Sequence, residues 1–329
     1  MSSSILNELR RLRLDDSTLS DSEALEAARL VDAIQKSALK RFSTGVVTAL
    51  PVEMAALEAC FDELHEIQMR GVRYKVATAA VRQSNKDRVL AIIKRATDAG
   101  NNMAAICASN MLNCFPNIEN VMVVGIAGGV PYPEKPEKHV RLGDIVVSDQ
   151  QGITQYDFGK QYGDFFEEKQ RGHPPSARLI DSVNELSTQE LKGVKAWEQT
   201  IDELQMKLSW ERPGEEFDIL FESDASNIVV PHPRDPDRVD GKPRIFRGKI
   251  GSANLVLKSS EHRKKIRDKH GIIAVEMEGS GIADATWNHR AGYLVVRGVC
   301  DYADGRKGDF WHKYASLVAA AYCKAILAL

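Results

Sequence analysis

The chain has 329 residues, of which 43% are hydrophobic and 27% charged, so it holds enough apolar material for one large α/β domain or two small ones. The formal net charge of −2 excludes a general electrostatic attraction to nucleic acid or to an acidic membrane. The sequence shows no N-terminal apolar run of the signal-peptide type, and no run approaches the roughly 20 apolar residues that cross a bilayer.

The cysteines are odd in number, widely spaced and without CxxC pairing or metal-ligand spacing. We interpret them as buried free thiols, which favours a cytoplasmic location. We therefore expect no nucleic-acid partner, no membrane, no metal and no organic cofactor. The five positions are Cys60, Cys107, Cys114, Cys300 and Cys323.

Residues 1–42 predict a helical N-terminal extension. Ser20 and Glu23 have the spacing of a capping box, and apolar residues follow them at helical intervals. We interpret this segment as an appendage that serves oligomerisation or a partner, outside the main domain of residues 43–329.

That main domain alternates short apolar β-type segments with helices, and Pro51 opens the first of these helices. Continuous apolar strands that alternate with helices imply a largely parallel sheet covered on both faces. We therefore predict a three-layer α/β/α sandwich with a largely parallel, mixed central sheet. In chain order we expect strands over 45–50, 72–81, 121–124, 143–148 and 293–299, and helices from 51 and over 87–111, 276–288 and 310–329.

Residues 150–246 interrupt this alternation with a long polar region. It contains one convincing helix, over about 189–208, and a Pro-rich stretch over 231–243. We interpret the region as an insertion whose helix and loops border the active site.

Acidic residues stand at junctions where side chains emerge from the predicted sheet. Glu53 and Asp301 each follow a strand, at the edge of an open α/β sheet where ligands bind. An acid in a first helical turn can instead complement the helix dipole, and an acid after a strand can be a helix N-cap. Glu276 and Glu278, two apart on a predicted helix, cannot share a face, so one of them is expected to be structural.

The glycine-rich segment 125–129 follows a predicted strand but lacks the full GxGxxG spacing and the Lys-Ser/Thr of a P-loop. Two interpretations stay open. The segment either lets a flat ligand rest against exposed backbone amides, or it forms a tight turn.

Together these pieces resemble the nucleoside phosphorylase superfamily, on the branch of the methylthioadenosine/adenosylhomocysteine nucleosidases. The resemblance covers about residues 44–150 and 246–329 and rests on motifs in a shared order. Sequences like those at 155–160 and 297–304 are typical of nucleosidase-like domains in fungal and bacterial immune proteins, some of which hydrolyse ATP or related nucleotides. The motifs are 49–53, 125–129 with 142–148, 275–278 and 297–304.

The resemblance implies cleavage of a purine N-glycosidic bond by two carboxylic groups on opposite sides of the bond, as in glycoside hydrolysis. Our hypothesis is that Asp301, kept protonated by partial burial, donates to purine N7. Glu53 stays ionised, holds the attacking water and takes its proton. The implied activity is hydrolysis of an adenine nucleotide to adenine and a ribose phosphate by a defence effector, and the implied assembly is a homo-oligomer.

The resemblance also implies the residues that bind the small-molecule substrate. Glu278 would accept hydrogen bonds from the ribose 2′- and 3′-hydroxyls, Met277 would pack against the sugar, and Glu276 flanks them. Ala127 and Gly128 would offer backbone groups to the base.

Candidates for a 5′ phosphate chain are Arg82, in a loop after a predicted strand, and Lys258, just after Asn254. An exposed, solvated role is the alternative for both cations. Val256 falls near the place where the family has an aromatic ring against the base, so Phe158 or Phe246 would have to stack there. Arginines of the Pro-rich region could add positive charge: Arg234, Arg238, Arg244 and Arg247.

Several alternatives stay open. Phosphorylases of the superfamily hold phosphate with an arginine-bearing glycine loop after the first strand, where this chain has residues 50–53 and an acid, which favours hydrolysis. A methylthioadenosine or adenosine nucleosidase and a phosphorolytic enzyme are the enzymatic alternatives. A catalytically silent nucleotide sensor that works through residues 1–42 is the alternative from another class.

Overall fold

The computed structural model describes residues 42–61, 63–80, 88–169 and 172–329. The predicted helical extension lies outside the described residues, apart from Phe42, and so does Arg82. Within the described part of the chain, no helix is both long and apolar enough to cross a membrane.

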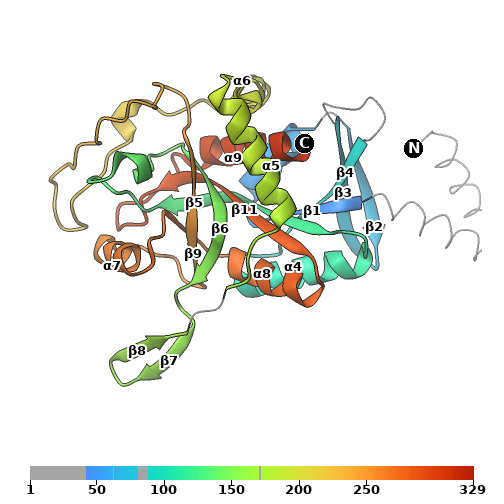
Figure 1. The fold of residues 1–329 in the computed structure, drawn as a ribbon, viewed down its shortest axis with the longest axis horizontal. Helices are drawn as coiled ribbons and strands as arrows, with labels where there is room; N and C mark the ends of the chain where they lie inside the picture. Colours follow the sequence, from blue (N-terminus) through green and yellow to red (C-terminus); the bar gives the residue numbers. More distant parts are fainter. Residues whose placement is uncertain (1–41, 62, 81–87, 170–171) are drawn as a thin grey trace, which may run out of the picture.

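A central sheet dominates the described residues (Figure 1). Its nine strands lie in the order β10-β9-β6-β11-β5-β1-β4-β3-β2, and an additional pairing of β10 with β5 closes five of them into a ring. Five strand pairs are parallel, whereas β11 with β6, β10 with β5, β2 with β3 and β3 with β4 are antiparallel. The strands are β1 (Phe42–Thr48), β2 (Leu64–Met69), β3 (Val72–Ala80), β4 (Arg88–Arg95), β5 (Asn120–Gly129), β6 (Ile145–Gln155), β9 (Ile245–Ser252), β10 (Ala274–Glu276) and β11 (Gly292–Asp301).

Helices cover both faces of this sheet (Figure 1), which confirms the predicted α/β class. On one face α9 packs against α3, α5 and α6, and on the other α4 packs against α8. The helices are α3 (Pro51–Ala59), α4 (Asn101–Cys114), α5 (Ala177–Leu191), α6 (Ala196–Leu208), α7 (Ser260–His270), α8 (Gly279–Asn288) and α9 (His312–Leu327), with short 3-10 turns η1 (Pro136–Lys138) and η2 (Glu215–Phe217).

The central strands are buried on both faces because helices lie above and below them. Val121, Met122 and Val123 of β5 are fully buried, as are Leu294 and Val295 of β11. Side chains of a strand alternate between the two faces, so a continuous apolar run is what a doubly covered strand requires. The strands expected near 121–124 and 293–299 are therefore confirmed.

The helix predicted over 87–111 is wrong in its first part and is confirmed from Asn101 on. Arg88–Arg95 forms strand β4 between β1 and β3, and α4 begins at Asn101 after Gly100, whose φ is +116°. Ala91, Ile92 and Ile93 are consecutive and all buried, which suits a strand covered on both faces. A short apolar run of this kind has no periodicity that separates strand from helix.

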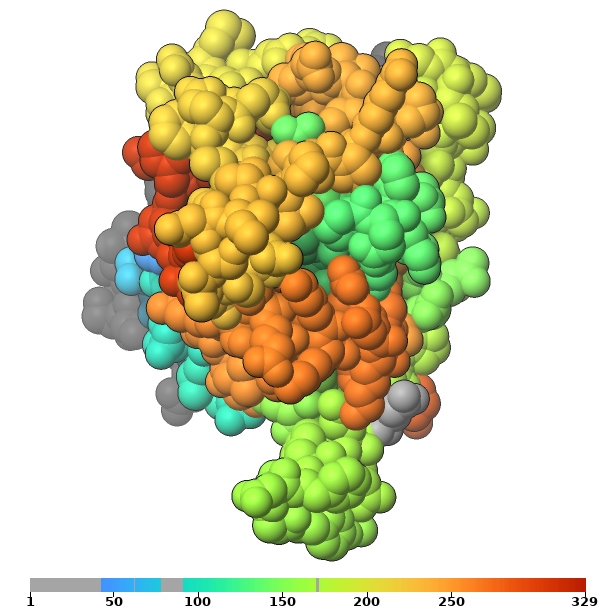
Figure 2. All heavy atoms as spheres, turned by 90° about the vertical axis from the view of Figure 1, so that its left-hand side faces the viewer, coloured from blue at the N-terminus to red at the C-terminus, as the bar shows by residue number. Residues whose placement is uncertain are grey.

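The polar region after β6 contains more regular structure than expected. The single helix predicted over 189–208 is two helices, α5 and α6, separated at Gly193, which has a φ of +78°. A hairpin of β7 (Gly159–Tyr162) and β8 (Phe165–Glu168) projects from the body of the molecule in Figures 1 and 2. In Figure 2 the gold and orange segment between α6 and β9 spreads over one face of the molecule.

Candidate active site

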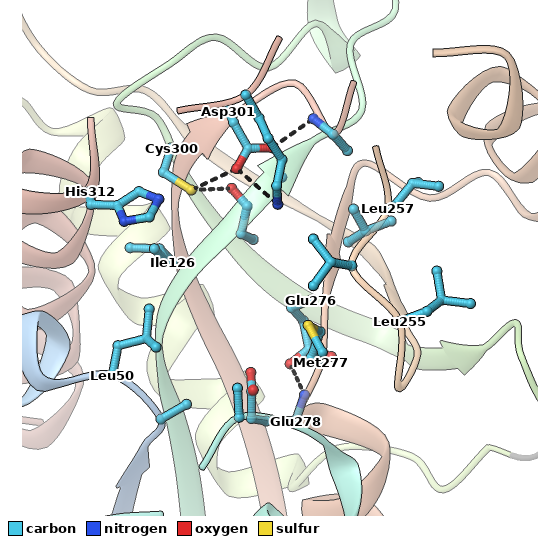
Figure 3. A pocket seen from close by; sticks show the side chains of 18 of the residues that line it. Leu50, Ile126, Leu255, Leu257, Glu276, Met277, Glu278, Cys300, Asp301 and His312 are labelled. Carbon is cyan, nitrogen blue, oxygen red and sulfur yellow. Dashed lines mark hydrogen bonds and ion pairs between the residues drawn. The ribbon is translucent and has the colours of Figure 1, made fainter. Parts of the chain in front are cut away.

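A cavity opens where β1, β5 and β11, which run in parallel, reach their carboxyl ends (Figure 3). The ends of parallel strands meet at one edge of a sheet, so residues distant in sequence come together there. Figure 3 shows Asp301, Cys300 and His312 at one end of this cavity and Glu278 at the other. Of the predicted site residues, the cavity is lined by Glu53, Ala127, Gly128, Glu276, Met277, Glu278 and Asp301.

Glu53 lies in the first turn of α3 and is buried. Its Oε2 accepts hydrogen bonds from the backbone N–H groups of Ala49 and Leu50, both at 2.8 Å, and its Oε1 accepts one from Ile126 N at 2.8 Å. Both oxygens of Glu53 thus act as hydrogen-bond acceptors. Glu53 does stabilise the start of its own helix, as the alternative interpretation proposed, and it also joins α3 to β5 across the cavity.

Glu276 and Glu278 do not lie on one helix, so the expectation that they cannot share a face is wrong. Glu276 ends strand β10, and Glu278 is the N-cap position of α8. Both carboxylates contact Nη2 of Arg297, and for Glu278 the distance is 2.9 Å. Glu276 also accepts hydrogen bonds from the N–H groups of Glu278 and Gly279 at 2.8 to 3.0 Å, so the protein itself occupies its carboxylate.

Arg297 pairs with three of the buried carboxylates, and the sequence analysis did not select it. It is fully buried in β11, and its Nη1 lies 3.9 Å from Glu53 Oε1. Burial alone would lower the pKa of this guanidinium, but the carboxylates of Glu276, Glu278 and Glu53 outweigh burial and raise it. The sequence does contain a signal for this residue, which is a single arginine inside an otherwise apolar strand. Such an arginine is buried, and a buried cation requires anionic partners.

Glu278 has a strongly perturbed acidity. Burial raises its pKa from 4.5 to about 7; Arg297 opposes that rise, and the charges of Glu276 and Glu53 add to it. Gly100 N donates to its Oε1 at 3.0 Å, which fixes the side chain from the α4 side. A carboxyl group with this environment can exchange its proton near neutral pH.

Asp301 is the last residue of β11 and is buried. Ala303 N donates to its Oδ1 at 2.7 Å, and the Cys300 thiol donates to its Oδ2 at 3.2 Å. Lys307 Nζ lies 3.8 Å from Oδ2. The helix N-cap alternative for Asp301 is wrong, because the next helix, α9, begins at His312.

The glycine-rich segment does not turn, so the tight-turn alternative is wrong. Residues 125–129 continue strand β5. A Cβ on Gly125 would collide with Glu53 Oε1 and lie 2.6 Å from Arg297 Nη1, and a Cβ on Gly128 would lie 3.0 Å from Asp301 Oδ1. The glycines at these two positions therefore allow the charged side chains to approach the backbone closely.

The structure does not bring every predicted substrate residue to the cavity. Asn254 Oδ1 accepts a hydrogen bond from Asn101 N at 3.0 Å, so Asn254 serves the start of α4. Lys258 is exposed, Phe158 is half-buried and Phe246 belongs to the core, and none of the three lines the cavity. Residues next to Asn254 line it instead, together with one aromatic ring: Leu255, Val256, Leu257 and Tyr156.

The predicted insertion contributes little to the cavity. Among the described residues of 150–246, Tyr156 alone lines it. Arg238 binds both oxygens of Asp144, at 2.9 and 2.6 Å, and Arg247 lies 3.2 Å from Glu190. These arginines are thus occupied by acids of the fold and do not form the expected positive surface at the site.

Three cavity residues that sequence reasoning did not select lie between β11 and the start of α9: Cys300, Lys307 and His312. Ligand atoms of Cys300, Asp301 and His312 lie within 4.8 Å of one another, a spacing that could hold a metal ion. Burial and Asp301 raise the pKa of the Cys300 thiol well above its ordinary range. Cys300 accordingly acts as a hydrogen-bond donor, to Asp301 and to Ala127 O at 3.4 Å.

Comparison with known proteins finds relatives over most of the chain. A nucleotide-binding leucine-rich repeat (NLR)-like protein of Hyaloscypha variabilis is 31% identical over 321 residues, which cover 90% of this chain but 31% of that protein. The ATP nucleosidase Cap17 of Escherichia coli is 25% identical over 84% of this chain and 49% of its own length. A 5′-methylthioadenosine/S-adenosylhomocysteine nucleosidase of Mycobacterium bovis is 22% identical over 87% of this chain and 96% of its own length.

The chain therefore spans about a third of the NLR-like relative and about half of Cap17. Among solved structures, the Helicobacter pylori 5′-methylthioadenosine/S-adenosylhomocysteine nucleosidase has a TM-score of 0.59 and 15% identity, covering 87% of this chain and 97% of that chain. The phosphorylase superfamily matches residues 43–328. The chain belongs to the phosphorylase superfamily.

Proposed function

We propose that this chain hydrolyses the N-glycosidic bond of an adenine nucleotide and releases adenine and a ribose phosphate. The observation that carries the proposal is the placement of Glu53, Glu278 and Asp301 around one cavity, each buried and each held by named donors. Similarity to the ATP nucleosidase Cap17 supports the nucleotide as substrate.

Each acid has a separate task in the proposed reaction. Asp301 donates a proton to purine N7, so the base leaves as a neutral molecule and the glycosidic bond breaks toward a ribosyl oxocarbenium ion. Glu53 accepts a proton from the water that attacks the anomeric carbon. Glu278 binds the ribose hydroxyls beside Met277, while Ile126, Ala127 and Gly128 form the wall against the base.

The contacts of Glu53 favour water over phosphate as the nucleophile. The N–H groups of Ala49, Leu50 and Ile126 point toward the cavity edge, where they could hold an anion. In this chain the Glu53 carboxylate accepts all three hydrogen bonds. A phosphate would have to displace that carboxylate or lie against it, and two like charges in a partly dry cavity repel each other strongly.

A second candidate is a methylthioadenosine-type nucleosidase. The observation that favours it is the apolar wall formed by Leu50, Leu255, Val256 and Leu257, which suits a thioether. The similarity to the Mycobacterium bovis enzyme points the same way. The resemblance to nucleosidase-like domains of immune proteins favours the nucleotide, and with it a role as a defence effector that depletes adenine nucleotides.

Product analysis tests the proposal. The purified protein is incubated with ATP, AMP, adenosine, methylthioadenosine and inosine, with and without phosphate, and free base is resolved by chromatography. We expect adenine from ATP or AMP without phosphate. Release that requires phosphate would overturn the hydrolytic assignment, release from methylthioadenosine alone would support the second candidate, and no release from any substrate would favour a nucleotide sensor.

Variants test the assigned residues. Asp301→Asn and Glu53→Gln are each expected to lower kcat by roughly 10²- to 10⁴-fold, the usual contribution of a positioned acid or base. Asp181→Asn and Glu58→Gln are matched controls, because Asp181 is exposed on α5, Glu58 lies on α3, and neither lines the cavity. Full turnover by either site variant would remove that residue from the mechanism.

A further inference from the structure

The catalytic cavity is lined by an unusual amount of negative charge. Glu53, Glu276, Glu278 and Asp301 all face it and all are buried. Arg297 pairs with the first three of these carboxylates, but among the described residues no ion pair joins it to Asp301. A substrate that carries phosphates adds further negative charge, so it requires a cation at the place where the phosphates lie.

Lys307 supplies a cation at the Asp301 end of the cavity. It belongs to the loop between β11 and α9, and a quarter of its side chain is exposed. Its Nζ lies 3.8 Å from Asp301 Oδ2, which is beyond hydrogen-bond distance. No hydrogen bond among the described residues holds the ammonium group, so a ligand can attract it without breaking one.

A second cavity adjoins the first at the same residues, because both are lined by Cys300, Asp301 and Lys307. The second cavity is also lined by Arg306, whose guanidinium stacks on Phe221 at 4.0 Å and donates to Ser226 O at 2.8 Å. These contacts fix a second cation in place before any ligand binds. A phosphate chain that leaves the first cavity past Lys307 therefore enters a space lined by a second cation, Arg306.

Two acids in the loop that contains Lys307 already have partners. Asp304 Oδ2 lies 3.4 Å from Arg263 Nη1, and Asp309 Oδ1 lies 3.5 Å from His312 Nε2. Asp304 and Asp309 balance the charges of Arg306 and Lys307 within the loop, but both acids are engaged by other residues, and Lys307 lines the cavity. Lys258, the candidate from the sequence, does not line either cavity.

We propose that Lys307 binds the phosphate chain of the substrate and thereby selects nucleotides over nucleosides and thioethers. The proposal rests on the proposed function, because it assumes that Asp301 binds the base at this end of the cavity. Arg306 extends the positive charge into the second cavity for the outer phosphates of a triphosphate. Lys307 thus determines which 5′ group the enzyme prefers, while Asp301 and Glu53 perform the cleavage.

The test compares kcat/KM for ATP, AMP, adenosine and methylthioadenosine in four proteins: the wild type, Lys307→Met, Lys307→Arg and Lys313→Met. Lys313 is an exposed lysine at the start of α9 that lines neither cavity, so its variant is a matched control. Lys307→Met removes a hydrogen bond between charged groups. We therefore expect kcat/KM to fall roughly 10- to 100-fold more for ATP than for adenosine, mainly through a rise in KM.

Lys307→Arg is expected to keep the preference for ATP, and Lys313→Met is expected to leave it unchanged. The proposal would be overturned if Lys307→Met kept the wild-type ratio of kcat/KM for ATP to kcat/KM for adenosine, whether or not both values fell. A wild-type enzyme that cleaves adenosine or methylthioadenosine but no nucleotide would instead overturn the nucleotide part of the proposed function, whatever the Lys307 variants do.

Discussion

Glu278 is held between two opposing influences. Burial raises its pKa to about 7, although Arg297 lies only 2.9 Å from its Oε2. As a carboxylate it accepts hydrogen bonds at both oxygens, but once protonated it must use one oxygen as a donor. In the proposed reaction, the ability of Glu278 to bind two ribose hydroxyls therefore changes near neutral pH.

We predict that kcat/KM rises with pH up to about 7, roughly tenfold per pH unit at the lower end, and then levels off, as expected for one ionisation. Glu278→Gln should lower kcat/KM and remove this rise, because glutamine does not ionise. A pH profile of adenine release measures both. If the Gln variant keeps the same acidic limb, another group controls it.

The same shift affects stability in the opposite direction. The folded pKa of about 7 lies above the ordinary value of 4.5, so the folded protein binds this proton more tightly than the unfolded chain does. The contribution of Glu278 to the free energy of unfolding is therefore present at low pH and falls as the pH rises from about 4.5 to 7.

Arg297 is the cation on which the buried carboxylates depend. Removal of one member of a buried ion pair leaves an uncompensated charge and typically costs about 3–5 kcal/mol. We predict a loss of this size in the free energy of unfolding of Arg297→Met, measured by urea denaturation, with partial recovery when Glu276→Gln is added.

Arg178→Met is the control for this comparison, because its pair with Glu119 is largely exposed, at 71% and 65% of the two side chains. Exposed pairs contribute about 0–1 kcal/mol. A loss below about 1 kcal/mol in Arg297→Met would show that the three carboxylates find other partners.

At the scale of an element, strand β5 forms the wall between the carboxylates of Glu53 and Asp301. Gly125 faces Glu53 and Arg297, and Gly128 faces Asp301. Glu53 is held by three backbone N–H groups, so it cannot move aside without losing them. The absence of side chains at these two positions thus sets the distance between the acids and the cavity wall.

We predict that Gly125→Ala lowers kcat by roughly 10²-fold, because a displacement of about 1 Å in a catalytic group has an effect of this size. Gly172→Ala is the control, since a Cβ there would meet its nearest atom at 3.9 Å. Adenine release reports activity, and urea unfolding shows that both variants are folded. Activity of Gly125→Ala within about twofold of the wild type would contradict the tight fit.

At the scale of the whole molecule, apolar side chains lie exposed beside the cavity. Leu255 and Val256 at its rim are 44% and 50% exposed, and Ile106 on α4 is 53% exposed. The hydrogen bond from Asn101 N to Asn254 Oδ1 joins the two segments. Exposed apolar side chains on neighbouring segments can form a patch of the kind that marks a protein interface.

We predict that a second copy of the chain covers this surface, in line with the expected homo-oligomer. Light scattering coupled to size exclusion should give at least a dimer, and Ile106→Glu should shift the mass toward the monomer. Leu191→Glu, at a residue that is 90% exposed on α5, should leave the mass unchanged. A monomeric wild type would contradict the prediction.

Much of the architecture could be predicted from sequence because the relevant signals are local. The apolar runs near 121–124 and 293–299 require burial on both faces, and Pro51 fits the first turn of a helix. Where local signals are ambiguous, the prediction failed: Arg88–Arg95 became a strand because β1 and β3 pair with it, and no property of the segment alone decides that.

The sequence by itself determined the fold class and which acids stand at strand ends. Both signals, the hydrophobic periodicity and the position after a strand, depend only on residues that are close together in the sequence. Only the tertiary structure decided what each charge does. Arg297 reaches carboxylates from α3, β10 and the start of α8, and Lys307 reaches a cavity that Lys258 does not. A buried charge is defined by the partners that folding brings to it from distant segments, and those partners are not visible along the chain.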